Sequence, residues 1–262
     1  QLCGGKQGEH MCKDGVNHYG SLCTELYERL HARAPEDELT FYLSHARPGQ
    51  KILESLCGSG RFLVPFLERG LDIRGMDASE EMLSKLREKA PRACAELADL
   101  AVYSPVERFD YIFISSGSVS LFTDLELCKG ILRRIRGLLA PDGVFVFAVD
   151  TVAARCPDDK EYRLTVSVPA GDGSELRLRT KNHYDPASQT QFSPGIYERY
   201  RGAALLEQET MDFQTHLYRY GEMEGYLAEA GFSRVTTYAT FAKEPAVDDR
   251  CEMFLFECAA DG

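Results

Sequence analysis

Residues 51 to 150 alternate short apolar runs with helix-like segments, and this rhythm constrains the fold more than any other feature of the chain. The run KILESL at 51–56 is typical of a buried strand, and GRFLVPFLERG at 60–70 of a helix. Strand signals recur at 71–77, 93–100, 109–118 and 141–150, with helix signals between them at 79–90 and 124–140. Strands separated by crossover helices pair in parallel. The sequence therefore predicts a doubly wound α/β sheet.

The rhythm changes after residue 150. The segment 160–216 alternates apolar and polar residues around AGDGS at 170–174, which is a strong hairpin signal. The pattern then predicts a helix at 221–232 and an antiparallel pair of strands at 233–241 and 250–259. We therefore expect a seven-stranded Rossmann-like sheet, mostly parallel with the last strand antiparallel. An antiparallel β insertion follows its fifth strand.

Charge and composition exclude several classes of protein. The formal net charge is −11, which argues against a protein that binds nucleic-acid phosphates. No apolar run approaches the roughly 18 residues of a membrane span, and the first residues lack the apolar core of a signal peptide. We therefore expect a cytoplasmic protein with no nucleic-acid or membrane partner.

The nine cysteines form no C-x-x-C pair, and their odd number makes a poor disulfide framework. Cys3, His10 and Cys12 lie close together near the start of the chain, but their spacing matches no zinc site. The sequence predicts reduced thiols and no bound metal.

A turn containing Gly58, Ser59 and Gly60 follows the first predicted strand. In open α/β sheets, ligands bind at the carboxyl ends of the strands, so this turn is a candidate binding site. A dinucleotide fold requires G-x-G-x-x-G, but Leu63 stands at the third glycine position. Glu54 precedes the turn, and a carboxylate there would repel a pyrophosphate and attract an ammonium group. The turn therefore favours a cofactor that carries an ammonium group.

These features resemble the class I S-adenosylmethionine-dependent methyltransferases. The family's first motif, acid-x-Gly-x-Gly-x-Gly, stands here as ESLCGSG, from Glu54 to Gly60. The acid that grips the ribose hydroxyls matches Asp77 in GMDASEEML, and the acid that faces the adenine matches Asp99 in ADLAVY. FDYIFISSGS, LLAPDGVFVFAV and YLAEAGFSRV resemble later motifs of the family in the same order. The family's first glycine is replaced by Leu56, which must point away from the turn or tighten the site.

The resemblance implies that the chain binds S-adenosylmethionine and releases S-adenosylhomocysteine. The residues implied in cofactor binding come from the strand ends and from an N-terminal helix that related enzymes fold over the site. They are Tyr19, Glu54, Cys57, Gly58, Ser59, Gly60, Arg61, Asp77, Ala78, Met82, Asp99, Leu100 and Ser115.

Each of these residues also has a purely structural interpretation. Asp77 could cap the following helix, and Asp99 could cap a loop. Glu54 could orient the amides of the turn, Arg61 could face solvent, and Cys57 could be a small buried filler. The sequence leaves these alternatives open.

Methyl transfer from a sulfonium requires proximity and alignment, and a proton acceptor only for some acceptors. No signature residue is therefore expected, and the catalytic residue stays unknown, with Tyr19 and His183 as the candidates. SSGSVS at 115–120 lacks the proline of nucleic-acid base methyltransferases, so we expect a small-molecule substrate. NAD-dependent oxidoreduction and non-catalytic adenosylmethionine binding are the alternatives.

We expect residues 1–45 to form an N-terminal helical segment that covers the site, and residues 46–258 to form the methyltransferase domain. The insertion at about 160–216 resembles the antiparallel lid of small-molecule methyltransferases. The alternative for the insertion is a homodimer interface.

Overall fold

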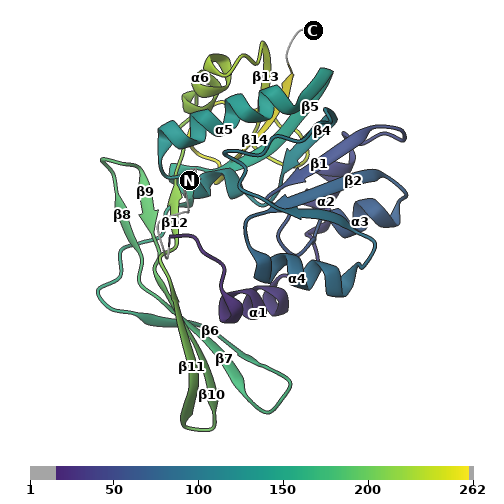
Figure 1. The fold of residues 1–262 in the computed structure, drawn as a ribbon. Helices are drawn as coiled ribbons and strands as arrows, with labels where there is room; N and C mark the ends of the chain where they lie inside the picture. Colours follow the sequence, from purple (N-terminus) through teal and green to yellow (C-terminus); the bar gives the residue numbers. More distant parts are fainter. Residues whose placement is uncertain (1–15, 260–262) are drawn as a thin grey trace, which may run out of the picture.

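The computed structural model describes residues 16–259, and its main feature is a seven-stranded sheet (Figure 1). The strand order is β13-β14-β5-β4-β1-β2-β3. Strands β1 to β5 pair in parallel, and β14 runs antiparallel to both β5 and β13. The predicted fold class is confirmed. The strands are β1 (Lys51–Ser55), β2 (Asp72–Asp77), β3 (Cys94–Leu97), β4 (Phe109–Ile114), β5 (Leu139–Asp150), β13 (Arg234–Tyr238) and β14 (Met253–Ala259).

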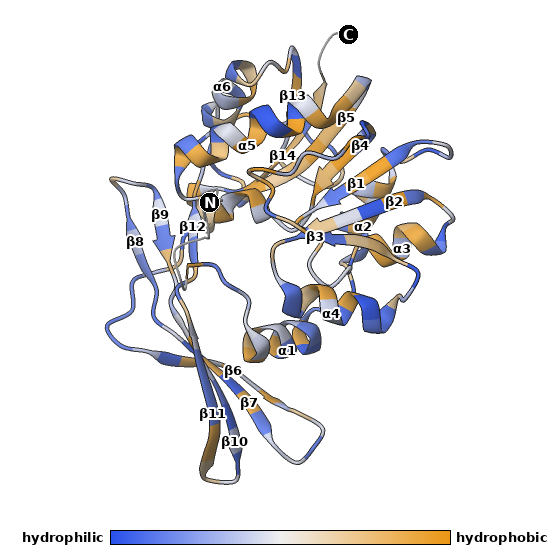
Figure 2. Ribbon diagram, in the orientation of Figure 1, coloured by the Kyte–Doolittle hydropathy of each residue, from blue (hydrophilic) through white to orange (hydrophobic). Residues whose placement is uncertain are grey.

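Helices cover both faces of this sheet. On one face, α5 (Leu125–Leu138) and α6 (Glu222–Glu229) pack against β4, β5 and β14. On the other face, α2 (Glu36–Leu43), α3 (Leu63–Glu68) and α4 (Glu80–Lys89) close a second core. Because the central strands are buried on both faces, β4 and β5 are apolar almost throughout (Figure 2).

Antiparallel strands between β5 and α6 form two smaller sheets. The first has the order β11-β10-β7-β6 and the second β12-β9-β8. In Figure 1 the four-stranded sheet projects away from the seven-stranded sheet. The predicted hairpin at AGDGS joins β6 to β7. The strands are β6 (Arg163–Pro169), β7 (Glu175–Thr180), β8 (His183–Asp185), β9 (Thr190–Phe192), β10 (Gly195–Arg201), β11 (Ala204–Met211) and β12 (Gln214–His216).

Helix α1 (Ser21–Leu30) lies between the four-stranded sheet and α4 (Figure 1). Its apolar side chains Leu22 and Leu26 form a third core with Leu176, Tyr197 and Met211 of the insertion. This third core contains no residue of the seven-stranded sheet. The apolar contacts of α1 are therefore made with the insertion.

No helix within residues 16–259 is long and apolar enough to cross a membrane. Within the same residues, no cluster of three histidine, cysteine or acidic side chains could hold a metal ion. Cys3, His10 and Cys12 lie outside the described residues.

Candidate cofactor and active site

The turn after β1 is built from backbone conformations that most residues avoid. Leu56, Gly58 and Gly60 have φ angles of 58°, 52° and 82°. Glycine adopts this left-handed region freely, whereas a residue with a Cβ is strained there by about 1–2 kcal/mol. The Leu56 side chain packs against the core on the α5 face. This packing offsets the strain where the family motif has glycine.

The two remaining glycines are needed for different reasons. A Cβ on Gly60 would lie 2.4 Å from Cδ1 of Leu86, so this glycine lets α4 pack closely against the turn. A Cβ on Gly58 would have no neighbour within 4 Å. The backbone at Gly58 therefore borders open space, as a ligand that approaches the main chain requires.

Asp77 ends β2 beside this turn. Its carboxylate accepts hydrogen bonds from the backbone N–H of Gly58 and of Ser79, both at 2.8 Å. Burial raises the pKa of Asp77, and the backbone donors oppose this shift without cancelling it. Ser79 caps α4 by accepting a bond from the Met82 amide at 3.2 Å. Asp77 therefore fixes the glycine turn of β1 and the entry to α4 at once.

Glu54 is 1% exposed and lies within β1. Its Oε1 accepts a hydrogen bond from the Ser115 hydroxyl at 3.1 Å. Its Oε2 is buried and has no hydrogen-bond partner within residues 16–259. Burial raises the pKa of Glu54 well above its usual value, and the Ser115 hydroxyl and the backbone N–H of Leu63 oppose this shift without cancelling it. A buried carboxylate oxygen without a partner is costly, and a ligand with a donor group would satisfy it.

The loop after β4 is the next part of the site, because β4 is the neighbour of β1 in the sheet. Ser116 has a φ of 61°, and its N–H donates to Oε1 of Glu38 at 2.7 Å. Nη2 of Arg61 donates to the Ser116 hydroxyl at 2.6 Å. The Arg61 guanidinium also lies 5.6 Å from the ring centre of Tyr27 on α1. Arg61 therefore does not simply face solvent, because it joins α1 to the loop after β4.

The other predicted cofactor residues have mixed surroundings. Ser59 is buried, and its hydroxyl donates to Glu28 of α1. Cys57 and Met82 are buried, and burial raises the pKa of the Cys57 thiol, so this group is a poor nucleophile. Ala78 is exposed beside Asp77.

Asp99 follows β3. Its Oδ1 accepts a hydrogen bond from the Ala101 N–H at 2.9 Å, so it caps the turn there. Leu100 is 2% exposed and belongs to the core on the α5 face. The contact of Asp99 with the adenine stays a prediction.

The two candidate catalytic residues lie in different surroundings. The Tyr19 carbonyl accepts a bond from the Ser79 hydroxyl at 3.2 Å, which places this residue beside Asp77. Burial raises the pKa of Tyr19, and the nearby Asp77 raises it further. His183 lies on β8, where Nδ1 is 3.3 Å from Asp158 and the side chain is 62% exposed. Its contacts involve none of the predicted cofactor residues.

Three acidic residues near these strand ends were not predicted from the sequence: Glu28, Glu38 and Asp150. Glu28 and Glu38 come from helices that precede the sheet, and no sequence pattern signals them. Asp150 is the last residue of β5 and is half-buried. Asp77 is identified by the resemblance to the family; the rule that ligands bind at the carboxyl ends of parallel strands would have pointed to Asp150 as well.

Residues 52–143 match a family described as a methyltransferase domain. A trans-aconitate 2-methyltransferase of Variovorax paradoxus is 29% identical over 171 residues, which cover 56% of this chain and 60% of that protein. A dTDP-3-amino-3,6-dideoxy-alpha-D-glucopyranose N,N-dimethyltransferase of Streptomyces fradiae is 24% identical over 221 residues. These cover 74% of this chain and 87% of that protein. The chain spans about half the length of most curated relatives that it matches.

The fold is that of the class I S-adenosylmethionine-dependent methyltransferases, which confirms the fold that the resemblance implies. The sugar N-methyltransferase KedS8 of Streptoalloteichus has this fold, with a TM-score of 0.73, 17% identity and full coverage of both chains. The chain therefore has the class I methyltransferase fold, with an antiparallel insertion after the fifth strand.

Proposed function

We propose that the chain transfers a methyl group from S-adenosylmethionine to a small-molecule acceptor. The observation that carries the proposal is the junction of two strand ends, where the Gly58 amide donates to Asp77 and the backbone at Gly58 borders open space. This junction brings the two motifs of the resemblance, which are 19 residues apart, into direct contact.

The residues present fit this cofactor. The two oxygens of Asp77 each accept one backbone donor, and each retains capacity for a ribose hydroxyl. The unpartnered Oε2 of Glu54 offers an acceptor for an ammonium group, and Arg61 offers a cation for a carboxylate. When bound, the cofactor would supply an activated methyl group on a sulfonium. The chain's part is to orient it, exclude water and receive the acceptor.

The proposal extends to the segments around the site. Of the predicted segment 1–45, residues 16–45 and the insertion at about 160–216 would cover the cofactor, with residues 46–258 as the catalytic domain; residues 1–15 lie outside the described residues. The contact of Ser59 with Glu28 supports a covering role for α1, and the contact of Ser79 with Tyr19, which precedes this helix, supports the same role for the residues before it. Relatives named for trans-aconitate and for an amino sugar support a small-molecule acceptor.

Calorimetric titration tests the proposal with S-adenosylmethionine, S-adenosylhomocysteine and NAD. We expect the two sulfur compounds to bind and NAD not to bind. Asp77→Ala should weaken binding by roughly 1.5–3 kcal/mol, the scale for losing hydrogen bonds to a charged group.

The matched control is Asp72→Ala, because Asp72 is exposed at the opposite end of the same strand. Equal affinities of the two variants for S-adenosylmethionine would show that Asp77 does not bind the cofactor. Binding of NAD without S-adenosylmethionine would remove the whole proposal.

A further inference from the structure

Asp150 occupies an unusual position at the edge of the sheet that carries the proposed site. It ends β5, and its Oδ1 would lie 3.1 Å from a Cβ placed on Gly117, so it borders the loop after β4. Neighbouring strands lie about 4.8 Å apart, which places β5 about 10 Å from β1. Across the strand ends, the order is Asp77 on β2, Glu54 on β1, the β4 loop, and then Asp150.

The backbone of Asp150 is held firmly. Its N–H donates to the Ser120 hydroxyl at 2.8 Å, and its carbonyl accepts from the Tyr218 N–H at 2.9 Å. Among residues 16–259, no hydrogen-bond or ionic partner of its carboxylate is found, and burial alone shifts its pKa. The fold therefore fixes the position of this side chain but leaves its charge uncompensated.

An acid in such surroundings is costly to ionise. Burial raises the pKa of Asp150 to about 6, and burial is the sole cause of this shift. A cation that entered the site would stabilise the carboxylate and recover this cost. A group whose pKa lies near neutrality is also well suited to exchange a proton with a bound substrate.

The charges nearby distinguish between acceptor classes. Glu38 of α2 is buried and accepts from the Ser116 N–H in the loop after β4, and Arg61 already contacts the Ser116 hydroxyl. A carboxylate acceptor at the end of β5 would therefore meet the unpaired carboxylate of Asp150. An ammonium group would meet an attractive charge there.

We infer that Asp150 binds the ammonium group of a small amine acceptor and takes up the proton that this nitrogen must lose, an inference that rests on the proposed function. The carboxylate accepts one proton from R–NH3⁺, which leaves a neutral amine with a free electron pair. That nitrogen forms the bond to the methyl carbon while the carbon–sulfur bond breaks, and the electron pair of the broken bond stays on sulfur. The product is R–NH2⁺–CH3, and the proton on Asp150 passes to solvent.

A binding experiment can test this inference without knowledge of the natural acceptor. The probes are n-propylamine, n-propanol and propionate, which have three carbons each and differ in charge. They are added to protein saturated with S-adenosylhomocysteine and labelled with ¹³C at aspartate carboxyl groups. The Asp150 resonance is assigned by its loss in Asp150→Asn. We expect n-propylamine alone to shift this resonance.

Stability and activity measurements separate this role from a structural one. Asp150→Asn should bind S-adenosylhomocysteine as the natural protein does and unfold at the same or a higher temperature, because it removes an unpaired carboxylate. Its rate with any amine that the natural protein methylates should fall roughly 100-fold or more. Asp72→Asn, at the far end of the sheet, should change neither property.

Several results would overturn the inference. One is a shift of the Asp150 resonance on addition of propionate or propanol. A second is the absence of a shift on addition of n-propylamine. Another is a marked loss of stability in Asp150→Asn, which would make this residue structural. Because S-adenosylhomocysteine binding is measured independently, its absence would instead count against the proposed function.

Discussion

The seven-stranded sheet and the antiparallel insertion are stabilised by different means. In the large sheet, Phe113 stacks between the rings of Tyr42, Phe66 and Tyr111, and both faces are covered by helices. The four-stranded sheet packs one face on α1 and carries ion pairs such as Arg179–Glu198. The comparison indicates that the large sheet is the stable frame and that the insertion depends on α1.

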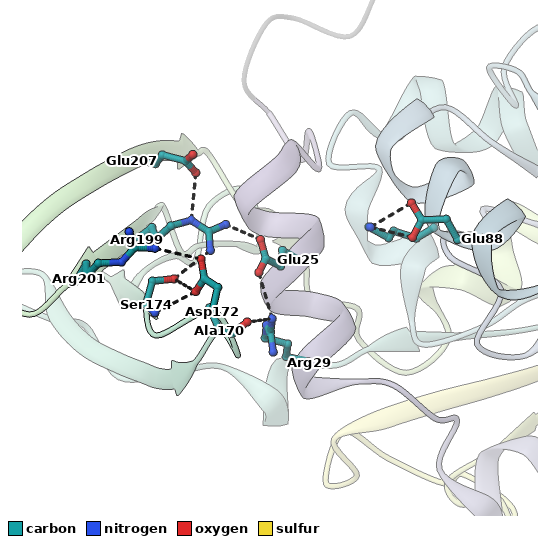
Figure 3. Close-up of polar contacts among 10 residues, drawn as sticks. Glu25, Arg29, Glu88, Ala170, Asp172, Ser174, Arg199, Arg201 and Glu207 are labelled. Carbon is teal, nitrogen blue, oxygen red and sulfur yellow. Dashed lines mark hydrogen bonds and ion pairs between the residues drawn. The ribbon is translucent and has the colours of Figure 1, made fainter.

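Helix α1 meets these two regions differently. Toward the large domain, its contacts are polar, such as Glu28 with Lys89 at 2.8 Å. Toward the insertion, it adds an apolar core and a charged network, in which Arg199 contacts Glu25, and Arg29 donates to the Ala170 carbonyl (Figure 3). We therefore expect α1 and the insertion to open as one unit, separately from the large sheet.

The largest expected effect tests this division directly. Phe113→Ala removes a fully buried ring and should lower the free energy of unfolding of the whole protein by about 3–5 kcal/mol. Leu176→Ala, in the third core, should lower amide protection only in α1 and the insertion. Hydrogen exchange followed by mass spectrometry distinguishes the two outcomes. Uniform loss of protection in Leu176→Ala would show that the molecule unfolds as one unit.

A smaller effect is expected where the insertion rejoins the large domain. Glu222 begins α6 and accepts bonds from His216 and from Gln189, each at 2.8 Å. Burial alone would raise the pKa of Glu222, but these bonds and the Arg219 amide outweigh it and lower the pKa to about 2.

A carboxyl group whose pKa is lower in the folded state stabilises the fold above its unfolded pKa, which is 4.5 here. This stabilisation is lost as the pH falls from about 4.5 towards about 2. The free energy of unfolding of Glu222→Gln should therefore be roughly 1–3 kcal/mol lower than that of the natural protein at neutral pH. This difference should shrink over that acidic range. Urea unfolding at a series of pH values measures it. Glu229→Gln, on the same helix but exposed, serves as control, and an equal loss there would contradict the assignment.

The two regions also differ in how far the sequence predicts them. The parallel sheet follows from apolar runs such as β4 and from the glycine turn, because these signals are local. No local sequence pattern predicts the left-handed conformation of Leu56, because the packing that offsets its strain involves residues distant in the sequence. The contacts of α1 with the insertion join residues more than 140 positions apart, so no local pattern could show them.

The smallest effect concerns the start of α1. The helix begins after Gly20 without a side-chain cap of its own, and the Glu209 carboxylate of β11 accepts from the N–H groups of Leu22 and Cys23 at 3.1 and 3.2 Å. A Cβ on Gly20 would lie 2.6 Å from this carboxylate, so the glycine permits the contact. An anion at a helix N-terminus satisfies free amides and interacts favourably with the helix dipole.

Glu209→Gln keeps the shape of the side chain and removes its charge, so it should weaken the attachment of α1 by about 1 kcal/mol or less. The measurement is amide exchange at Leu22 and Cys23 by NMR, where protection should fall several-fold while that of β4 stays unchanged. Glu207→Gln is the matched control, because this residue lies on the same strand and contacts Arg199 at 3.2 Å without touching the helix amides. Equal losses in the two variants would mean that the overall negative charge of this region, and not the contact of Glu209 with the helix amides, holds α1 in place. A parallel loss of protection in β4 would instead join α1 to the large sheet and break the division between the two regions.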